Sequence, residues 1–209
     1  MKRWKGICLI LLGCGIALHY FLEWHTGSSS AESMNREEVN KYSKIERQTE
    51  AVQSKPVEKQ GSNPQTPSTK EKHIKGKKIA TLFIPELQQK YSVYWGAEET
   101  VLKKGVGMYV SDLTTSPAGG GHTVLSGHRD TVFFRLQELQ KGDIMNVEYD
   151  GNIFSYRINE IYITDAEDRT VIVKKSSPLL TLTTCYPFNY VGRAPERYII
   201  QATLIDQSV

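Results

Sequence analysis

Short runs of β-forming residues recur from residue 79 to residue 205, and turn signals separate them. The alternation is clearest at Phe154-Ser-Tyr156-Arg-Ile158, whose apolar residues share one face of an extended chain. Asp150-Gly-Asn152 predicts a tight hairpin between two of the runs. Many short strands with turns between them favour a mainly β fold, as a closed or nearly closed barrel. The predicted strands are residues 79–84, 91–94, 122–126, 144–149, 153–163, 179–184 and 198–205.

Helical patterns are short in the same part of the chain. Residues 98–103 predict about a turn and a half of helix, and residues 132–140 predict a second short helix. Only residues 74–209 hold enough apolar side chains for a core, so we expect this stretch to form a single domain.

An apolar run over residues 6–22 follows a basic amino end. At ~1.5 Å of rise per residue, these 17 residues reach about 26 Å as a helix, which suits a thin bilayer. Because the positive flank precedes the run, the positive-inside rule places everything after residue 25 outside the cell. We therefore expect residues 1–25 to be a cytoplasmic flank and a transmembrane signal-anchor, with residues 6–22 in the membrane.

Two alternatives remain open for this segment. A cleaved signal peptide needs small residues directly after the run, and Trp24-His25 occupy that place. Leu-Leu-Gly-Cys14 loosely resembles a lipoprotein acylation site, although the apolar run continues past Cys14. The uncleaved anchor is the favoured interpretation.

Residues 26–73 are rich in Ser, Gln, Glu, Lys and Pro, and Tyr42 is their only aromatic residue. Such a composition buries too little apolar surface to offset the entropy of ordering the chain. A loose helical pattern over residues 34–52 predicts at most a marginal helix. We expect residues 26–73 to be a flexible extracellular linker between the anchor and a domain over residues 74–209.

The net charge of +3 is weak, and the basic residues do not form a face interleaved with aromatic residues. We therefore expect no nucleic-acid partner. Asp165, Glu167 and Asp168 form an acidic turn that a cation could use, but a solvated turn explains these residues better. We expect no cofactor and no required metal.

Cys185 is the only cysteine outside the apolar amino-terminal run. Exported proteins usually pair their cysteines or have none, so an unpaired one is a candidate nucleophile. Cys185 ends the predicted strand 179–184, and Tyr186-Pro187 takes the chain out of the sheet because Pro donates no ladder hydrogen bond. On its own, however, a cysteine at a strand end is more often a small buried apolar residue.

His128 follows the predicted strand 122–126 through Gly127. Imidazole is a suitable proton shuttle between a thiol and an amine near neutral pH. His122 has the same strand parity and is a rival base, which we rank second because it lacks the flanking Ser-Gly and Arg-Asp residues.

Arg197 opens the last predicted strand. If this strand lies beside the strand of Cys185, the guanidinium comes close to the thiol and can stabilise an oxyanion. Arg193 is nearer in sequence, but it lies in a loop and we expect it to be solvated.

Taken together, three segments resemble the motifs of the sortase family, in its class D branch. They are Leu-Ser-Gly-His128-Arg-Asp-Thr-Val-Phe, Thr-Leu-Thr-Thr-Cys185-Tyr-Pro-Phe and Ala-Pro-Glu-Arg197-Tyr-Ile-Ile. The resemblance spans residues 74–209 and includes Lys104-Gly-Val-Gly-Met-Tyr109. It implies an eight-stranded sortase-type β-barrel outside a Gram-positive-type cell membrane, held by a single-pass anchor.

The resemblance also implies a reaction and a role for each residue. Cys185 attacks the carbonyl after Thr in an LPxT-type sorting signal, and His128 shuttles the proton. Arg197 positions the substrate and steadies the oxyanion, to which Thr184 adds its hydroxyl or backbone N–H. The expected partners are surface proteins with a carboxy-terminal LPxT(A/G/S)-like signal and an amine acceptor such as a peptidoglycan precursor.

Two other functions remain open at this point. Water can resolve a thioacyl intermediate, so the same site could belong to a thiol peptidase. The chain could also be an anchored β-barrel binding module in which Cys185 is inert. Other cysteine–histidine enzymes of the cell wall need a different order or spacing of the two residues.

Overall fold

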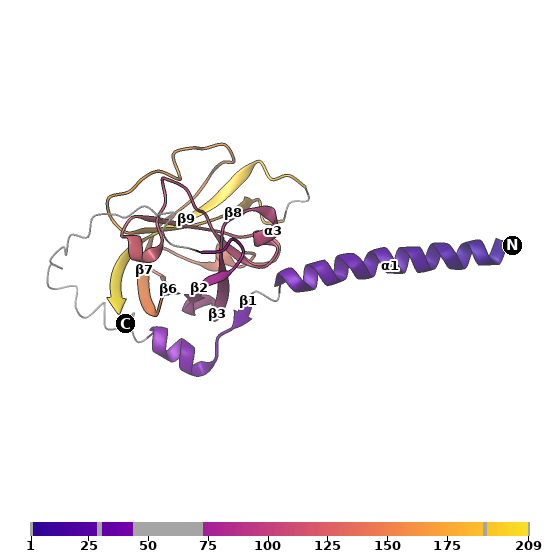
Figure 1. The fold of residues 1–209 in the computed structure, drawn as a ribbon, viewed down its shortest axis with the longest axis horizontal. Helices are drawn as coiled ribbons and strands as arrows, with labels where there is room; N and C mark the ends of the chain where they lie inside the picture. The colour runs from indigo at the N-terminus through magenta and orange to yellow at the C-terminus, as the bar shows by residue number, and fades with distance from the viewer. Residues whose placement is uncertain (1, 29–30, 44–72, 190–191, 209) are drawn as a thin grey trace.

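The computed structural model describes residues 2–28, 31–43, 73–189 and 192–208. Within these residues nine strands form one sheet, and eight of them, β2 to β9, close into a barrel (Figure 1). Around the barrel the order is β3-β2-β6-β7-β9-β8-β5-β4, and β4 returns to β3 by parallel pairing. The strands are β1 Ala31–Ser33, β2 Lys78–Ile84, β3 Gln89–Trp95, β4 Val106–Met108, β5 His122–Ser126, β6 Ile144–Tyr149, β7 Asn152–Asp165, β8 Leu179–Tyr186 and β9 Glu196–Ser208. The mainly β barrel predicted from the sequence is confirmed.

The β6–β7 hairpin forms at the predicted residues. Asp150 and Gly151 have φ angles of 49° and 76°, the left-handed values that a type I′ turn requires. Beyond the turn, Phe154, Tyr156 and Ile158 of β7 point into the core, and each is at most 2% exposed. The alternation in the sequence therefore marks the inner face of the barrel.

β4 was not among the predicted strands, although it closes the barrel. It has only three residues, and Gly107 stands in the middle. A Cβ at Gly107 would lie 2.5 Å from the carbonyl oxygen of Gly96, so only glycine permits this close approach of two backbones. With glycine in the middle of three residues, the sequence of β4 shows no alternation of apolar side chains from which a strand could be predicted.

The short helices agree only in part with expectation. The helix α3, Glu99–Leu102, forms where the sequence predicts it. The helix predicted over residues 132–140 is wrong, since only a 3₁₀ turn, η3 Leu136–Glu138, occurs there. Two further 3₁₀ turns are η1 Pro85–Leu87 and η2 Pro117–Gly119. The apolar spacing that imitates a helix comes from loop side chains packed into the core, namely Val132, Phe133, Leu136 and Leu139.

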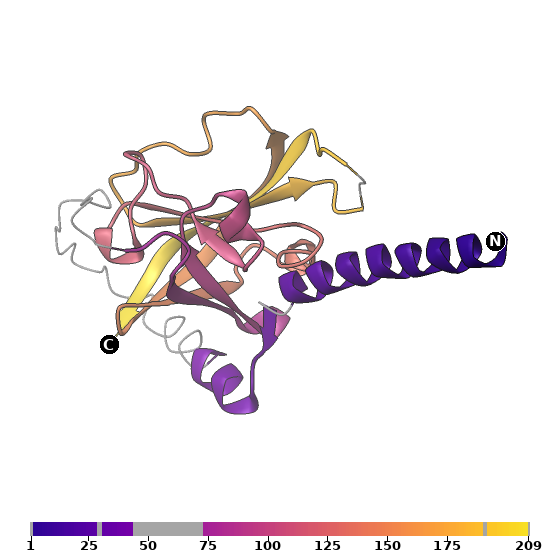
Figure 2. The ribbon, with the colours of Figure 1, turned by 45° about the vertical axis from the view of Figure 1, so that its right-hand side comes forward.

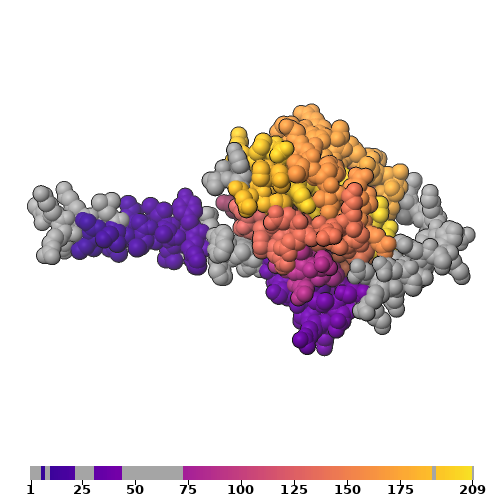
Figure 3. Space-filling model, turned by 180° about the vertical axis from the view of Figure 1, so that it is seen from behind, coloured from indigo at the N-terminus to yellow at the C-terminus, as the bar shows by residue number. Residues whose placement is uncertain are grey.

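Part of the segment expected to be a flexible linker is folded onto the barrel. β1 pairs antiparallel with the first half of β3, and residues 36–43 form a helix. The space-filling view shows this segment against one side of the barrel (Figure 3). The expectation of a linker over residues 26–73 is therefore wrong for residues 31–43. It is also wrong for residues 26–28, which end the helix that begins at Lys2. The expectation over residues 29–30 and 44–72 lies outside the described residues.

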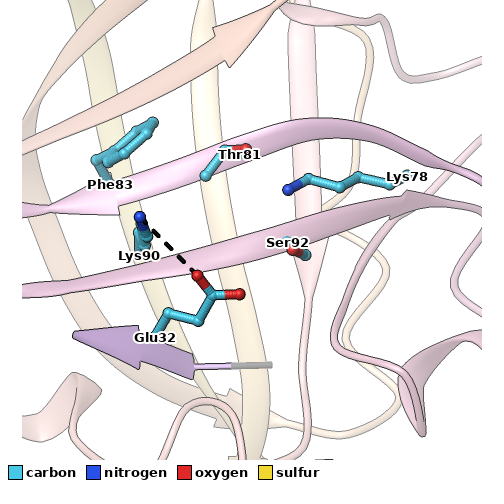
Figure 4. Close-up of a pocket in the computed structure, with 6 residues that line it drawn as sticks. All are labelled: Glu32, Lys78, Thr81, Phe83, Lys90 and Ser92. Carbon is cyan, nitrogen blue, oxygen red and sulfur yellow. Dashed lines mark ion pairs between the residues drawn. The ribbon is translucent and has the colours of Figure 1, made fainter. Parts of the chain in front are cut away.

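An apolar contact and an ion pair hold this segment. Tyr42 stacks on Phe83 with ring centroids 4.3 Å apart, in a buried cluster with Met34 and Ile153 on the outside of the barrel. Lys90 of β3 donates to Glu38 at 2.7 Å. Lys90 also lies 3.9 Å from Glu32 of β1 (Figure 4). The segment folds with few apolar residues of its own, because Phe83 and Ile153 of the barrel provide an apolar surface for Met34 and Tyr42.

The apolar amino-terminal run lies in the helix α1, Lys2–Ser28, which projects from the barrel (Figures 1 and 2). Its side chains Ile10, Leu11 and Leu12 are 67%, 66% and 62% exposed. Among the residues whose side chains the structure describes, no helix is both long and apolar enough to cross a membrane. The predicted anchor is not confirmed.

Candidate active site

Cys185 stands near the end of β8, between β5 and β9 in the sheet. Leu180 and Leu182 lie in the core, so the alternation of the strand puts Cys185 on the outer face of the barrel. Its thiol is free and half-buried. This position leaves the sulfur accessible to a substrate at the edge of the barrel.

Arg197 is the direct partner of Cys185 in the antiparallel pairing of β8 with β9. Side chains directly opposite each other share one face, with Cβ atoms about 4.5–5.5 Å apart. Its Nη1 donates to the carbonyl oxygens of Ala194 at 3.3 Å and Glu196 at 3.0 Å, which hold the guanidinium beside the strand start. The sequence predicted that Arg197 lies close to Cys185, and the strand register agrees with this prediction. Arg193 is exposed, in agreement with a solvated position.

His128 reaches the same edge of the barrel because β5 runs parallel to β8 and ends opposite Thr183, two residues before Cys185. Ser126 is the register partner of Thr183, and the N–H of Gly127 donates to the carbonyl oxygen of Thr183 at 3.2 Å. His128 and Cys185 each follow this last register pair by two residues, which brings His128 to the part of β8 that carries Cys185. The His128 side chain is 33% exposed, which suits a group that exchanges protons with a bound substrate.

Thr184 joins the two strands more tightly. Its hydroxyl donates to the carbonyl oxygen of Gly127 at 2.7 Å, and the residue is only 3% exposed. A hydroxyl has one proton, so this hydroxyl cannot also donate to a substrate oxyanion. The expected contribution of the Thr184 hydroxyl to an oxyanion hole is thereby corrected, and its contact supports the backbone next to His128 instead.

Two features of the site were missed in the sequence. Glu99 of α3 lies 3.7 Å from the Nε2 of His128, and an exposed carboxylate at that distance gives weak support to the imidazolium. Tyr186 and Phe188 pack against Tyr198 with ring centroids 6.2 Å and 5.1 Å apart. Tyr198 is the register partner of Thr184, so this aromatic cluster lies behind the thiol, on the inner side of the sheet. Burial, followed by the nearby Tyr186, raises the pKa of Tyr198. Nothing in the sequence spacing predicts the contact with Glu99, whereas the aromatic residues near Cys185 in the sequence were a visible signal.

His122 does not take part in this constellation. Its side chain is 0% exposed, and both ring nitrogens are engaged. Nδ1 lies 2.8 Å from the carbonyl oxygen of Val173, and Nε2 lies 2.7 Å from the hydroxyl of Thr181. Because a carbonyl only accepts, Nδ1 carries the proton and Nε2 accepts from Thr181. Burial lowers the pKa of His122, and such a group is no rival base for Cys185.

The acidic turn after β7 is occupied by local hydrogen bonds. Asp168 accepts from the hydroxyls of Thr164 and Thr170, and these bonds lower the pKa of Asp168. Asp165 accepts from the backbone N–H of Glu167 at 2.7 Å. Over the part of the chain that the structure describes, no group of three or more His, Cys, Asp or Glu side chains is arranged to hold a metal.

Known proteins are similar to this chain in fold and in sequence. The family model described as Sortase domain matches residues 82–205. Sortase D of Bacillus subtilis (strain 168) is 40% identical over 151 residues, which cover 70% of this chain and 75% of that protein. The catalytic domain of B. anthracis SrtD is 58% identical with a TM-score of 0.59, over 67% of this chain and 95% of that one. A Clostridium perfringens Sortase D5 transpeptidase is 27% identical with a TM-score of 0.58, over 78% of this chain and 99% of that one.

The chain belongs to the sortase family of cysteine transpeptidases, in its class D branch. The resemblance inferred from the three motifs is confirmed, as is the expectation of an enzyme. Sortases act on surface proteins that carry sorting signals and on cell-wall precursors. A binding module with an inert cysteine is no longer a competing interpretation.

Proposed function

We propose that this sortase cleaves an LPxT-type sorting signal after Thr and transfers the protein to an amine of a peptidoglycan precursor. The single observation that carries the proposal is the register pairing of Cys185 with Arg197, next to the strand end from which His128 projects. A nucleophile, a cation and a proton shuttle at one edge are the groups that acyl transfer needs.

In the first step the proton of the Cys185 thiol passes to His128, the sulfur attacks the Thr carbonyl, and the carbonyl oxygen becomes an oxyanion beside Arg197. The C–N bond then breaks, His128 protonates the departing amine, and a thioester remains on Cys185. In the second step His128 accepts a proton from the incoming amine, which attacks the thioester and releases the thiol. Thr184 acts as a positioning residue, because its hydroxyl holds the backbone carbonyl of Gly127.

We propose further that residues 1–25 anchor the enzyme in a Gram-positive-type cell membrane with residues 74–209 outside it. The exposed apolar side chains of α1 support this assignment, since a helix exposing Ile10, Leu11 and Leu12 needs an apolar partner. The catalytic domain in this scheme is supported on its outer surface by residues 31–43.

The proposal is tested with residues 26–209, which keep β1 on the barrel. Quenched LPxTA, LPxTG, LPxTS and LAxTG peptides are incubated with the enzyme, with and without an amine acceptor, and the products are resolved by mass. We expect cleavage of at least one LPxT peptide, ligation when the amine is present, and neither with Cys185→Ala. Cleavage that survives Cys185→Ala would overturn the nucleophile, and cleavage without ligation to any acceptor would favour a hydrolase.

A further inference from the structure

The connection between β7 and β8, residues 166–178, crosses the outer face of the barrel. It begins at the catalytic edge, where the N–H of Ala166 donates to the carbonyl oxygen of Pro195 at 3.0 Å. It ends at the opposite edge, where the N–H of Leu179 donates to the carbonyl oxygen of Gly121 at 3.0 Å. The segment therefore runs along the same face of the sheet that carries Cys185.

Much of this segment is in contact with solvent. Its exposed residues are Glu167, Arg169, Thr170, Lys174, Ser176 and Ser177. Val171 is buried at 6% exposure, so one apolar side chain contributes to holding the middle of the segment. A segment with so little apolar burial needs a polar contact to fix its position over the sheet.

His122 provides that contact. Successive side chains of a strand point to opposite faces. Leu125, three residues after His122 in β5, lies in the core, so His122 lies on the outer face. Its Nδ1–H donates to the carbonyl of Val173, and its Nε2 accepts from Thr181 of β8. One fully buried ring therefore joins β5, β8 and the 166–178 segment. Burying a polar ring costs free energy unless both nitrogens are hydrogen-bonded. Both nitrogens of His122 are bonded, so the ring can link the three elements without that cost.

The position of Thr181 relates this contact to the substrate. Thr181 and Cys185 share one face of β8 and are four residues apart. At ~3.3 Å per residue they are about 13 Å apart, which is the length of four extended peptide residues. A peptide acylated on Cys185 and extended along this face would end beside the 166–178 segment.

We propose that His122 is a positioning residue that holds residues 166–178 as a wall of the peptide-binding groove. It acts on recognition of the residues amino-terminal to the scissile bond, and it does not touch the reacting atoms. This inference rests on the proposed function, because it assumes an extended peptide substrate on Cys185. Loss of His122 therefore weakens substrate binding while the reactivity of the thiol is retained.

The test uses the full chain in detergent micelles and compares His122→Phe with His122→Asn. His122→Phe removes both hydrogen bonds, whereas His122→Asn keeps a donor that can reach the Val173 carbonyl. Ile158→Ala, a core substitution in β7 remote from the 166–178 segment, is the control for general destabilisation. The measurements are KM and kcat for the best LPxT peptide, the rate of Cys185 alkylation by iodoacetamide, and amide exchange of residues 171–175.

We expect His122→Phe to raise KM at least fivefold with kcat within twofold of wild type, because binding that is equal in ground and transition states affects KM alone. In His122→Phe the rate of Cys185 alkylation stays at the wild-type value, and the amides of residues 171–175 exchange faster than in the wild type. In His122→Asn we expect a smaller rise of KM than in His122→Phe. The exchange readout needs no substrate. If His122→Phe folds poorly, His122→Ala takes its place, because it also removes the hydrogen bond to Val173.

Three results would overturn the inference: an unchanged KM in His122→Phe, unchanged exchange of residues 171–175 in both variants, or an equal rise of KM in Ile158→Ala. Failure of the wild type to cleave any LPxT peptide is a different outcome. It would contradict the proposed function, while faster exchange in the variants would still report the contact made by His122.

Discussion

At the scale of single residues, hydrogen bonds within the protein decide which side chains are available to a substrate. Thr184 and His122 both carry groups that could act on a substrate, and both are engaged inside the protein. Cys185 and His128 remain half-buried, so the two groups assigned to the chemistry are also the ones that a substrate can reach. Burial thus separates the residues proposed to position the site from those proposed to react.

Replacing Thr184 by Val tests its positioning role. The change keeps the shape and leaves the Gly127 carbonyl without its donor, which lowers the free energy of unfolding by about 1–2 kcal/mol. We expect kcat to fall ~10- to 100-fold, because a small displacement of His128 misaligns the proton transfer. Peptide cleavage and urea unfolding measure the two effects. Thr184→Ser keeps the hydroxyl and is the control, and equal losses in both variants would argue against the hydrogen bond.

His122 gives the stability a dependence on pH. Burial lowers the pKa of His122, the bond to Val173 opposes this, and the cation of Lys175 lowers the pKa further. The unfolded chain therefore binds a proton below pH ~6.5 that the folded chain does not accept until lower pH, so stability falls as the pH drops through this range. Urea unfolding at pH 7.5 and pH 5.5 measures the fall. His122→Gln should lose less stability over this interval, and an identical loss in both proteins would contradict the assignment.

At the scale of elements, the sequence predicts those strands whose side chains alternate. The hairpin at Asp150-Gly151 and the strand through Phe154 follow local rules, and both form as expected. β4 and β1 could not be found in this way, because each has three residues and gains its stability from the neighbours it pairs with. In the same way, the three proposed catalytic residues were visible through their motifs, whereas the contact of Glu99 with His128 exists only after folding.

The folded part of the predicted linker leads to a prediction at the scale of elements. Tyr42 is 2% exposed and stacks on Phe83, so Tyr42→Ala should release residues 31–43 from the barrel. Loss of a buried aromatic ring of this kind costs about 3 kcal/mol, which corresponds to ~100-fold weaker protection of the β1 amides. Hydrogen exchange measures the protection, and Glu37→Ala, at an exposed position of the same helix, is the control. Unchanged protection in Tyr42→Ala would show that the stack does not hold the segment.

At the scale of the whole molecule, the barrel brings together residues that are far apart in the sequence. The parallel pairing of β5 with β8 joins His128 to Cys185, and the antiparallel pairing of β8 with β9 adds Arg197. β4 closes the barrel against β3 and completes the frame that fixes these strand ends. The site is thus a consequence of strand order, and the account rests on one chemical event there, the formation of a thioester on Cys185.

The most direct test is the intact mass of the full chain after brief incubation with an LPxT peptide and no amine acceptor. The account predicts a mass increase equal to the acyl fragment that ends in Thr, carried on the peptide containing Cys185. The adduct should disappear on addition of hydroxylamine, which cleaves thioesters, and should be absent from Cys185→Ala. A wild-type protein that turns over the peptide with no adduct on Cys185, or with an adduct on another residue, would contradict the account.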